Sequence, residues 1–267
     1  MARTGLSCRA AGFWCICLPM QRVLILGATS AVAAEVAVLH AARGDRLHLV
    51  GRDPRKLAAL VSRLGGGERV TQASADFSRL DACADIVAES IRALGGLDRA
   101  LIAHGLLGDQ LASERAFAEA EAILQTNLLS VIALLIPLAN HFESARAGRL
   151  CVITSVAGDR GRPRNYTYGT AKGALNLYLQ GVRSRLWRSG ARVTAIKLGP
   201  VDSPMTVSHQ KNALFARADQ VAPAIVRAMD RGAGEVYAPS FWAAIMLLVR
   251  AAPEWLFQRA SFLSGRD

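Results

Sequence analysis

Short apolar runs rich in β-branched residues alternate along this chain with longer stretches in which apolar positions recur at a helical period. Such alternation is typical of repeated βαβ units, whose strands form a parallel sheet with helices on both faces. We therefore predict an α/β fold with a doubly wound parallel sheet of seven strands flanked by helices. The predicted strands cover residues 22–27, 46–50, 69–74, 98–103, 149–154, 192–198 and 235–238, and the predicted helices cover 30–43, 54–64, 79–94, 113–145, 166–189 and 219–231.

The pattern indicates a single domain over residues 21–267, because no linker, repeat or low-complexity tract divides it. Pro137 lies inside the longest predicted helix, and its missing backbone donor predicts a kink or a break there. Residues 1–20 form an N-terminal extension that superficially resembles a signal peptide. Cleavage near Met20 would leave a protein that starts with its first core strand, so a misassigned start, with translation beginning at Met20, is the simpler interpretation.

Composition favours a cytoplasmic setting. The chain has five cysteines, and three of them lie in the first seventeen residues, which is not the disulfide framework of a secreted domain. No apolar run reaches the roughly 20 residues that span a bilayer.

The net charge of +11 comes mostly from the C-terminal part of the chain. Residues 1–154 hold 16 Lys and Arg against 14 Asp and Glu, whereas residues 155–267 hold 16 against 7. The arginines are scattered and no aromatic residues interleave with them in a patch, so we expect no nucleic-acid binding. An arginine-rich composition explains the surplus most simply, and attraction to anionic lipid or to a phosphorylated substrate is the alternative.

The first turn between a strand and a helix predicts a dinucleotide site of the Rossmann type. Residues 27–33 read GATSAVA, and at such a turn backbone amides and the positive end of the helix bind a pyrophosphate. We expect Gly27, Thr29, Ser30 and Val32 to contact the cofactor. Only Gly27 of the usual glycines is present, so this turn alone favours a cofactor site only slightly over a structural turn.

The end of the second predicted strand favours NADP(H) over NAD(H). An acidic residue there would bind the ribose hydroxyls of NAD, whereas Arg52 beside Gly51 offers a cation and space for the 2′-phosphate of NADP. The alternative is a solvated arginine in a turn. Asp76, after the third strand, is a candidate contact to the adenine amino group, but capping of the helix that starts near Ser78 competes with this role.

The strongest chemical signal lies in residues 155–172, which read SVAGDRGRPRNYTYGTAK. Tyr168 and Lys172 are four residues apart on one helical face, so the ammonium can stabilise a phenolate and bring a pKa of about 10 toward neutrality. Tyr168 can then give or take a proton at a carbonyl or an alcohol. Ser155 follows an apolar strand and can polarise the same oxygen.

Joined to Asn127 and to the N-terminal dinucleotide turn, this set resembles the short-chain dehydrogenase/reductase (SDR) family over essentially the whole chain from about residue 22. The resemblance implies an NAD(P)-dependent oxidoreductase that acts on CH–OH or C=O groups, with a catalytic tetrad of Asn127, Ser155, Tyr168 and Lys172. It also implies that Lys172 binds the nicotinamide ribose and that Asn127 holds a water in a proton relay. No metal ion is expected.

Two further segments resemble motifs of the same family. Residues 198–205 resemble its PG motif, which implies that Pro200, Val201 and Ser203 contact the nicotinamide end of the cofactor. Residues 102–105 read IAHG where the family has NNAG. There we expect Gly105 to contact the cofactor, whereas a structural histidine is the favoured interpretation of His104.

The segments IAHG, SVAGDRGRPRNYTYGTAK and EVYAPSFWAAIMLLVRAAPEWLFQR resemble one subgroup of the family, the decaprenylphosphoryl-2-keto-erythropentose reductases and their uncharacterised bacterial relatives. This resemblance implies that the substrate is a keto sugar on a polyprenyl phosphate and that an FAD-dependent oxidase is the partner that makes it. A broad-specificity ketone or fatty-chain reductase is the alternative among enzymes. A cofactor-sensing or scaffold protein is the non-enzyme alternative.

The C-terminal helical segment is nearly continuously apolar over residues 241–249. Such a segment would lie in a membrane interface, as a peripheral contact at the inner face of the membrane, or pack against its own core or a partner subunit.

Arg160, Arg162 and Arg164 could reach a substrate phosphate or be solvated. The family resemblance implies a homo-oligomer through the helices around Asn127 and Tyr168.

Overall fold

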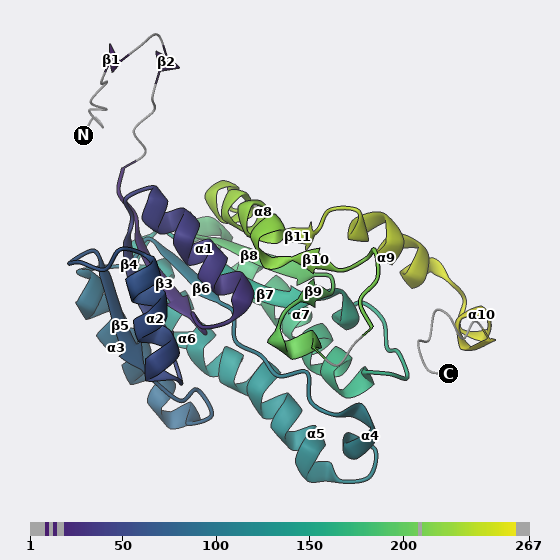
Figure 1. Cartoon of the computed structure of the whole chain (residues 1–267). Helices are drawn as coiled ribbons and strands as arrows, with labels where there is room; N and C mark the ends of the chain where they lie inside the picture. The colour runs from purple at the N-terminus through teal and green to yellow at the C-terminus, as the bar shows by residue number, and fades with distance from the viewer. Residues whose placement is uncertain (1–8, 11–12, 15–18, 208–209, 260–267) are drawn as a thin grey trace.

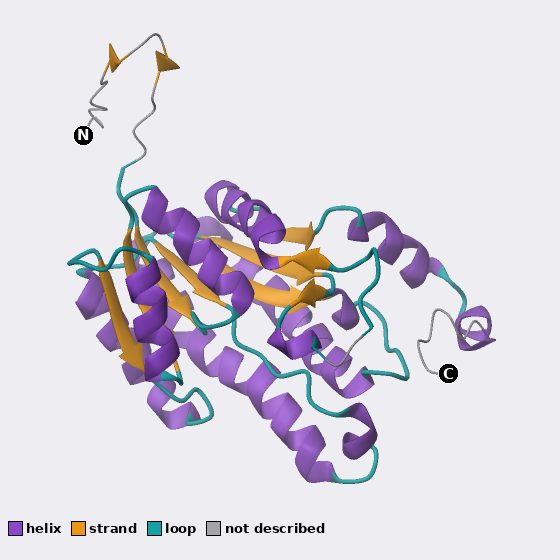
Figure 2. Cartoon of the chain, viewed as in Figure 1, coloured by secondary structure: helices purple, strands orange, loops and turns teal. Residues whose placement is uncertain are grey.

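A seven-stranded parallel sheet lies at the centre of the computed structural model, which describes residues 9–10, 13–14, 19–207 and 210–259 (Figure 2). Its strand order is β11-β8-β7-β6-β3-β4-β5. The predicted strands and the predicted fold class are confirmed. In chain order the strands are β3 Arg22–Leu26, β4 Arg46–Gly51, β5 Val70–Ser74, β6 Arg99–Ile102, β7 Arg149–Ser155, β8 Arg192–Leu198 and β11 Glu235–Ala238.

Helices cover both faces of the sheet because successive strand side chains point to opposite faces and are apolar on both (Figure 1). The helices α1 Ala31–Ala42, α2 Pro54–Arg63 and α8 Ala218–Arg231 enclose one hydrophobic core. The helices α3 Cys83–Leu94, α6 Ser130–Ala145 and α7 Tyr166–Leu186 enclose the other.

The order of the strands reverses between β3 and β6, which pair directly. Loops leave the carboxyl ends of these two strands toward opposite sides, and ligands of doubly wound sheets bind in the crevice that results. Gly27, Arg52 and Ser155 all lie at this edge, at or just after the ends of β3, β4 and β7. The fold therefore brings the predicted cofactor turn and the predicted catalytic residues to one edge.

The predicted helix over 113–145 is several elements: α4 Gln110–Ser113, α5 Phe117–Leu124, the π-helical turn η2 Gln125–Leu129, and α6. Of the kink or break predicted at Pro137, the break is wrong, because α6 continues through this proline. By length and composition alone, the 29 residues Phe117–Ala145 are long and apolar enough to cross a membrane, although charged residues interrupt their apolar run. Leu134, Leu138 and Phe142 of this stretch are fully buried in the core, as in the core helix of a folded domain.

After β11 the chain forms α9 Trp242–Ala251 and α10 Glu254–Arg259, which extend to the outer edge of the molecule (Figure 1). A third, small hydrophobic core joins α9 to Val156 in the loop after β7. Short elements complete the described chain: the strands β1 Arg9–Ala10, β2 Phe13–Trp14, β9 Val201–Asp202 and β10 Ala216–Arg217, and the 3-10 turns η1 Leu80–Ala82, η3 Val156–Gly158, η4 Trp187–Ser189 and η5 Pro204–Thr206.

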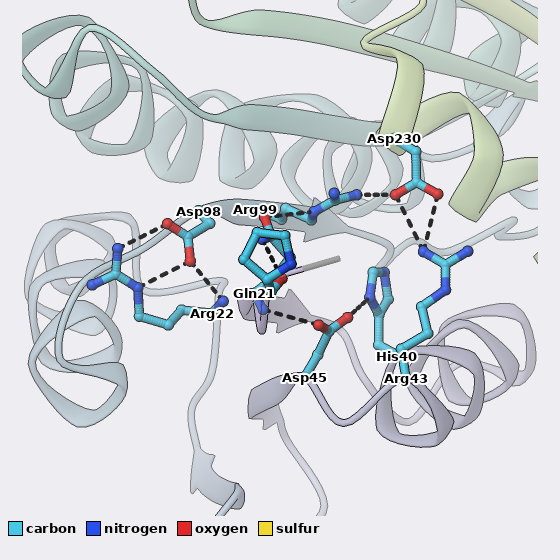
Figure 3. A network of polar contacts seen from close by, with 9 residues as sticks. Gln21, Arg22, His40, Arg43, Asp45, Asp98, Arg99 and Asp230 are labelled. Atoms are coloured by element: carbon cyan, nitrogen blue, oxygen red, sulfur yellow. Dashed lines mark hydrogen bonds and ion pairs between the residues drawn. The ribbon is translucent and has the colours of Figure 1, made fainter. Parts of the chain in front are cut away.

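Charged side chains form a network at the amino edge of the sheet, opposite the predicted site (Figure 3). Asp230 at the end of α8 accepts hydrogen bonds from Arg43, at 3.0 Å, and from Arg99. Asp45 accepts from the buried His40, with 2.7 Å between Oδ2 and Nδ1, and from the backbone of Gln21 at 2.9 Å. These contacts join α1 and α8, which cover the same face of the sheet, to the strand starts, far from the carboxyl edge.

Candidate active site

Three of the predicted catalytic residues meet at the carboxyl edge of the sheet. Ser155 is the last residue of β7, and Tyr168 and Lys172 lie in the first two turns of α7. The Tyr168 hydroxyl is hydrogen-bonded to Ser155, and the Lys172 ammonium lies 5.7 Å from the centre of the Tyr168 ring. Lys172 Nζ also lies 3.4 Å from the main-chain oxygen of Ile153. A carbonyl oxygen placed between Ser155 and Tyr168 could therefore accept two hydrogen bonds.

Close backbone packing sets the distance between the Ser155 loop and α7. A Cβ on Gly158 would lie 2.7 Å from the backbone nitrogen of Gly173, and a Cβ on Gly169 would lie 2.8 Å from the oxygen of Ala157. Side chains at these positions would push the loop away from the helix. Ser155 Oγ also accepts a hydrogen bond from the backbone of Ala157 at 3.1 Å, which orients the side chain.

Burial controls the protonation of the pair. Burial raises the pKa of Tyr168 to about 12, and only the hydrogen bond with Ser155 acts in the opposite direction. Burial lowers the pKa of Lys172 to about 8. The expected shift of the tyrosine pKa toward neutrality is wrong for this structure, because desolvation of the phenolate dominates and raises that pKa. At neutral pH Tyr168 is a neutral phenol.

Asn127 is fully buried in the π-helical turn between α5 and α6. Its side-chain nitrogen donates to the oxygens of Leu106, at 2.6 Å, and Ile123, at 2.8 Å. Its side-chain oxygen accepts from the backbone of Leu106 at 3.1 Å. Both amide hydrogens are thus committed to main-chain oxygens, so the side chain can bind a relay water only through the second lone pair of its oxygen.

The turn after β3 fits a dinucleotide. Gly27 has φ +80°, and a Cβ there would lie 2.5 Å from the backbone nitrogen of His104, so only glycine fits. Ser30 caps α1 by accepting from the backbone of Ala33 at 3.2 Å, and the buried Val32 anchors the first helical turn in the core. The glycine-poor turn therefore keeps the one glycine that the geometry requires and presents the positive end of α1 to a phosphate. Thr29 packs against Gly51 at the end of β4.

Arg52 is exposed just after β4, where the sequence predicts recognition of the adenosine ribose. The neighbouring Asp53 caps α2 by accepting from the backbones of Arg55 and Lys56, at 2.9 and 3.1 Å. Asp53 is therefore engaged in a helix cap, and the Arg52 guanidinium has no hydrogen bond or ion pair with another residue that the structure describes. Asp76 accepts from the backbone of Ser78 at 3.0 Å within a turn. The predicted helix cap is wrong, because η1 begins at Leu80 and α3 at Cys83, and Asp76 caps neither.

His104 and Gly105 follow β6, beside both the cofactor turn and the catalytic helix. His104 Nε2 lies 2.8 Å from Ser130 Oγ, and its ring packs at 4.7 Å against Phe77. Burial lowers the pKa of His104 to about 3, so the imidazole is neutral, in agreement with a structural role. A Cβ on Gly105 would lie 2.9 Å from Asn127 Oδ1, so glycine is required where the strand meets the π-helical turn.

The segment from Pro200 to Ser203 follows β8 and pairs with β10, an element that the sequence did not predict. The sequence also missed Trp242 of α9, whose indole covers Gly199 so closely that a Cβ there would lie 2.1 Å from Nε1. The sequence signals that bear on this contact are the glycine at position 199 and, farther along the chain, the apolar run of residues 241–249.

The three arginines after Ser155 have different surroundings. Arg160 donates to the oxygen of Val249 at 2.9 Å and to Glu254 at 2.7 Å, and its guanidinium lies over the Phe257 ring. Neither of the two alternatives left open by the sequence, a phosphate contact or a solvated side chain, describes these contacts. Arg162 is partly buried against Met246, and its Nε has no hydrogen-bond partner within the described ranges. Arg164 is exposed. Among the described residues, no group of three or more His, Cys, Asp or Glu side chains is placed to hold a metal ion.

The fold and the site define a dinucleotide-dependent oxidoreductase. A model of the short chain dehydrogenase family matches residues 21–214. An uncharacterised oxidoreductase of Mycobacterium tuberculosis (strain ATCC 25618 / H37Rv) is 32% identical over 239 residues, which cover 89% of this chain and 96% of the relative. Another, from Streptomyces coelicolor, is 31% identical over 246 residues, which cover 90% and 96%. A short chain dehydrogenase from Burkholderia cenocepacia J2315, solved in complex with NADP, has the same fold, with a TM-score of 0.77 and 18% identity over 90% of this chain and 97% of that chain.

The chain belongs to the short-chain dehydrogenase/reductase family and is an NAD(P)-dependent oxidoreductase acting on CH–OH or C=O groups. Family membership leaves the non-enzyme alternative without support.

Proposed function

We propose that the chain uses NADPH to reduce a ketone to a secondary alcohol, with Asn127, Ser155, Tyr168 and Lys172 as its catalytic residues. The observation that carries this direction is the partly buried Tyr168 beside Ser155 and Lys172, where desolvation raises the tyrosine pKa to about 12. A tyrosine that holds its proton at neutral pH is suited to donate it to an oxygen that gains negative charge. The reduced nicotinamide supplies the hydride when it is bound.

Each catalytic side chain has a role that its position supports. Ser155 donates a hydrogen bond to the ketone oxygen, and Tyr168 transfers its proton to that oxygen. The Lys172 ammonium stabilises the phenolate that remains, and Asn127 holds the base of the site through its bonds to Leu106 and Ile123.

The cofactor contacts proposed here follow the carboxyl edge of the sheet. Backbone groups from Gly27 to Val32 would hold the pyrophosphate, with Thr29 and Ser30 between them. Arg52 would bind the 2′-phosphate of NADP, supported by its exposure and by the engagement of Asp53 in a helix cap. Further contacts would come from Asp76 and Gly105, from Lys172 at the nicotinamide ribose, and from Pro200, Val201 and Ser203 at the nicotinamide.

For the substrate we propose a keto sugar carried on a polyprenyl phosphate, supplied by an FAD-dependent oxidase. The resemblance to decaprenylphosphoryl-2-keto-erythropentose reductases supports this class. Arg162 and Arg164 both lie in the loop after Ser155, and the exposed guanidinium of Arg164 is suited to a substrate phosphate. A broad-specificity ketone or fatty-chain reductase would need neither arginine.

We propose a cytoplasmic protein with a peripheral contact to the inner face of the membrane. Leu247 and Leu248 of α9 are 68% and 74% exposed, and Trp255 of α10 is 60% exposed. Arg250 and Arg259 lie on the same helices, and exposed apolar and basic side chains together suit an anionic bilayer surface. Co-sedimentation with phosphatidylglycerol vesicles, reduced by Leu248→Ser, would support this contact, whereas equal recovery with and without vesicles would contradict it.

A homo-oligomer is proposed through α6 and α7. A groove of about 550 Å³ between them is lined by Leu128, Ile132 and Leu177, and Leu177 is 70% exposed. Burial of this apolar surface by a second copy of the chain would stabilise both copies. Sedimentation equilibrium tests the proposal, because Leu177→Asp would then shift the protein toward monomer.

A panel of ketones separates the candidate substrates. NADPH and NADH oxidation would be followed with simple ketones, fatty-chain ketones and a keto pentose on a short polyprenyl phosphate, and the alcohol product identified. Preferred turnover of the lipid-linked sugar supports the specific proposal, and preferred turnover of the simple or fatty-chain ketones supports the broader reductase. Absence of turnover with every ketone contradicts the proposed function.

A further inference from the structure

A buried charged cluster lies behind the catalytic loop, in a part of the molecule that the proposed reaction does not use. Asp159 lies in the loop between β7 and α7, and its side chain is 4% exposed. Its Oδ1 lies 2.8 Å from Nζ of Lys197, and its Oδ2 accepts from the hydroxyl of Tyr237 at 2.6 Å. Lys197 is 5% exposed and also pairs with Glu235 at 3.1 Å.

Sheet register brings this cluster together from three strands. Lys197 of β8 is the direct partner of Tyr237 on β11 and of Thr154 on β7, one residue before Ser155. The Lys197 ammonium also lies 5.3 Å from the centre of the Tyr237 ring. Asp159 is thus held by two side chains anchored in the sheet, on β8 and β11. Of these strands, β8 pairs with β7, which ends at Ser155.

The same loop is fixed on its other side by α7. Gly158, the residue before Asp159, lies against the backbone of Lys172 and Gly173 without room for a side chain. A shift of Asp159 would therefore move the loop relative to the helix that carries Tyr168 and Lys172. Burial by itself would lower the pKa of Lys197, but its bonds to Asp159 and Glu235 raise it, so the Lys197 ammonium keeps its charge at neutral pH.

We propose that Asp159 is a positioning residue, whose carboxylate, held by Lys197 and Tyr237, sets the geometry of Ser155 against Tyr168. The proposal rests on the proposed function and adds a determinant of it that lies outside the catalytic tetrad. A misplacement of about 1 Å in a catalytic constellation can cost about a hundredfold in rate.

The test compares Asp159→Asn and Tyr237→Phe with Asp230→Asn. The control removes an ion-paired carboxylate at the opposite edge of the sheet, so it reports the loss of stability without a change at the site (Figure 3). The measurements are kcat and KM for the ketone, the Kd of NADPH by fluorescence, the melting temperature, and the isotope effect with NADPH deuterated at the transferred position.

The expected result for Asp159→Asn at 25 °C is a fall in kcat of about tenfold or more, with the Kd of NADPH within twofold of wild type. The isotope effect on kcat should rise, because hydride transfer becomes slower than product release. Tyr237→Phe should show a smaller change in the same direction, and Asp230→Asn should lower only the melting temperature. Two results would overturn the proposal. One is a wild-type kcat in Asp159→Asn. The other is an equal fall in kcat in Asp159→Asn and Asp230→Asn when the melting temperatures of both variants fall by the same amount.

If wild-type protein reduces no ketone, the proposed function fails, and hydrogen exchange then tests the positioning role by itself. Amides of residues 156–162 should exchange faster in Asp159→Asn than in wild type, with the amides of α7 unchanged. Equal exchange in the two proteins would overturn the positioning of the loop.

Discussion

Gly27 and His104 touch across the crevice between β3 and β6, where a Cβ on Gly27 would lie 2.5 Å from the backbone nitrogen of His104. Backbone atoms cannot yield as a flexible side chain can, and Gly27 also has φ +80°. The contact explains why glycine is required at this position of the turn, although the other glycines usual in such a turn are absent.

Gly27→Ala should therefore destabilise the protein and weaken cofactor binding. We expect a loss of about 1–3 kcal/mol from backbone strain, with a further loss from the clash. Thermal unfolding with and without NADPH measures both effects. Gly66→Ala is the matched control, because Gly66 has φ +59° with open space around it, so it reports strain without the clash. Equal losses in the two variants would show that the His104 contact does not matter.

Lys172→Met should abolish turnover and raise stability. The folded-state pKa of Lys172 is about 8 against an ordinary 10.5, so the buried charge costs roughly 3 kcal/mol at neutral pH. Between these values the unfolded chain binds more protons than the folded one, so this group makes wild-type stability rise with pH across that window. Urea unfolding at pH 7 and at pH 10 measures the difference between wild type and variant, which should shrink toward pH 10. A variant that is less stable at pH 7 would contradict this account.

Ketone reduction should slow as pH rises through about 8. Because the pKa of Tyr168 is about 12, Tyr168 keeps its proton in this range. The fall in kcat therefore reports the deprotonation of Lys172, whose ammonium stabilises the phenolate left by proton transfer. The measurement is kcat from pH 6 to 10 at saturating NADPH. A rate that is flat across this range would show that the Lys172 charge does not contribute.

Arg52→Ala should raise KM for NADPH and leave KM for NADH nearly unchanged. A charged hydrogen bond to a phosphate contributes about 1.5–3 kcal/mol, which corresponds to roughly tenfold to a hundredfold in KM. Arg55→Ala, three residues later at an exposed position of α2, is the matched control. Equal effects on KM for the two cofactors would instead support the alternative that Arg52 is a solvated arginine in a turn.

The strands and the grouping of Ser155, Tyr168 and Lys172 could be predicted because their signals are local. Each strand is an apolar run between helical stretches, and Tyr168 and Lys172 share one helical face by their spacing alone. Ser155 was found because it ends such a run.

The Asp159 cluster and the Trp242 contact could not be predicted, since both depend on long-range register between β7, β8, β11 and α9. The contacts of Arg160 could not be predicted for the same reason: its partners Val249 and Glu254 lie about ninety residues away in sequence. The tyrosine pKa was misjudged because spacing places Lys172 near Tyr168 but does not report their burial.

The most direct test of the central claim is kcat/KM for ketone reduction in Tyr168→Phe and in Tyr166→Phe. Both tyrosines lie in the first turn of α7, but Tyr166 is 43% exposed, whereas Tyr168 is hydrogen-bonded to Ser155. We expect Tyr168→Phe to lose at least about a hundredfold, in keeping with removal of a general acid, while Tyr166→Phe retains wild-type activity. Full activity in Tyr168→Phe would contradict the account.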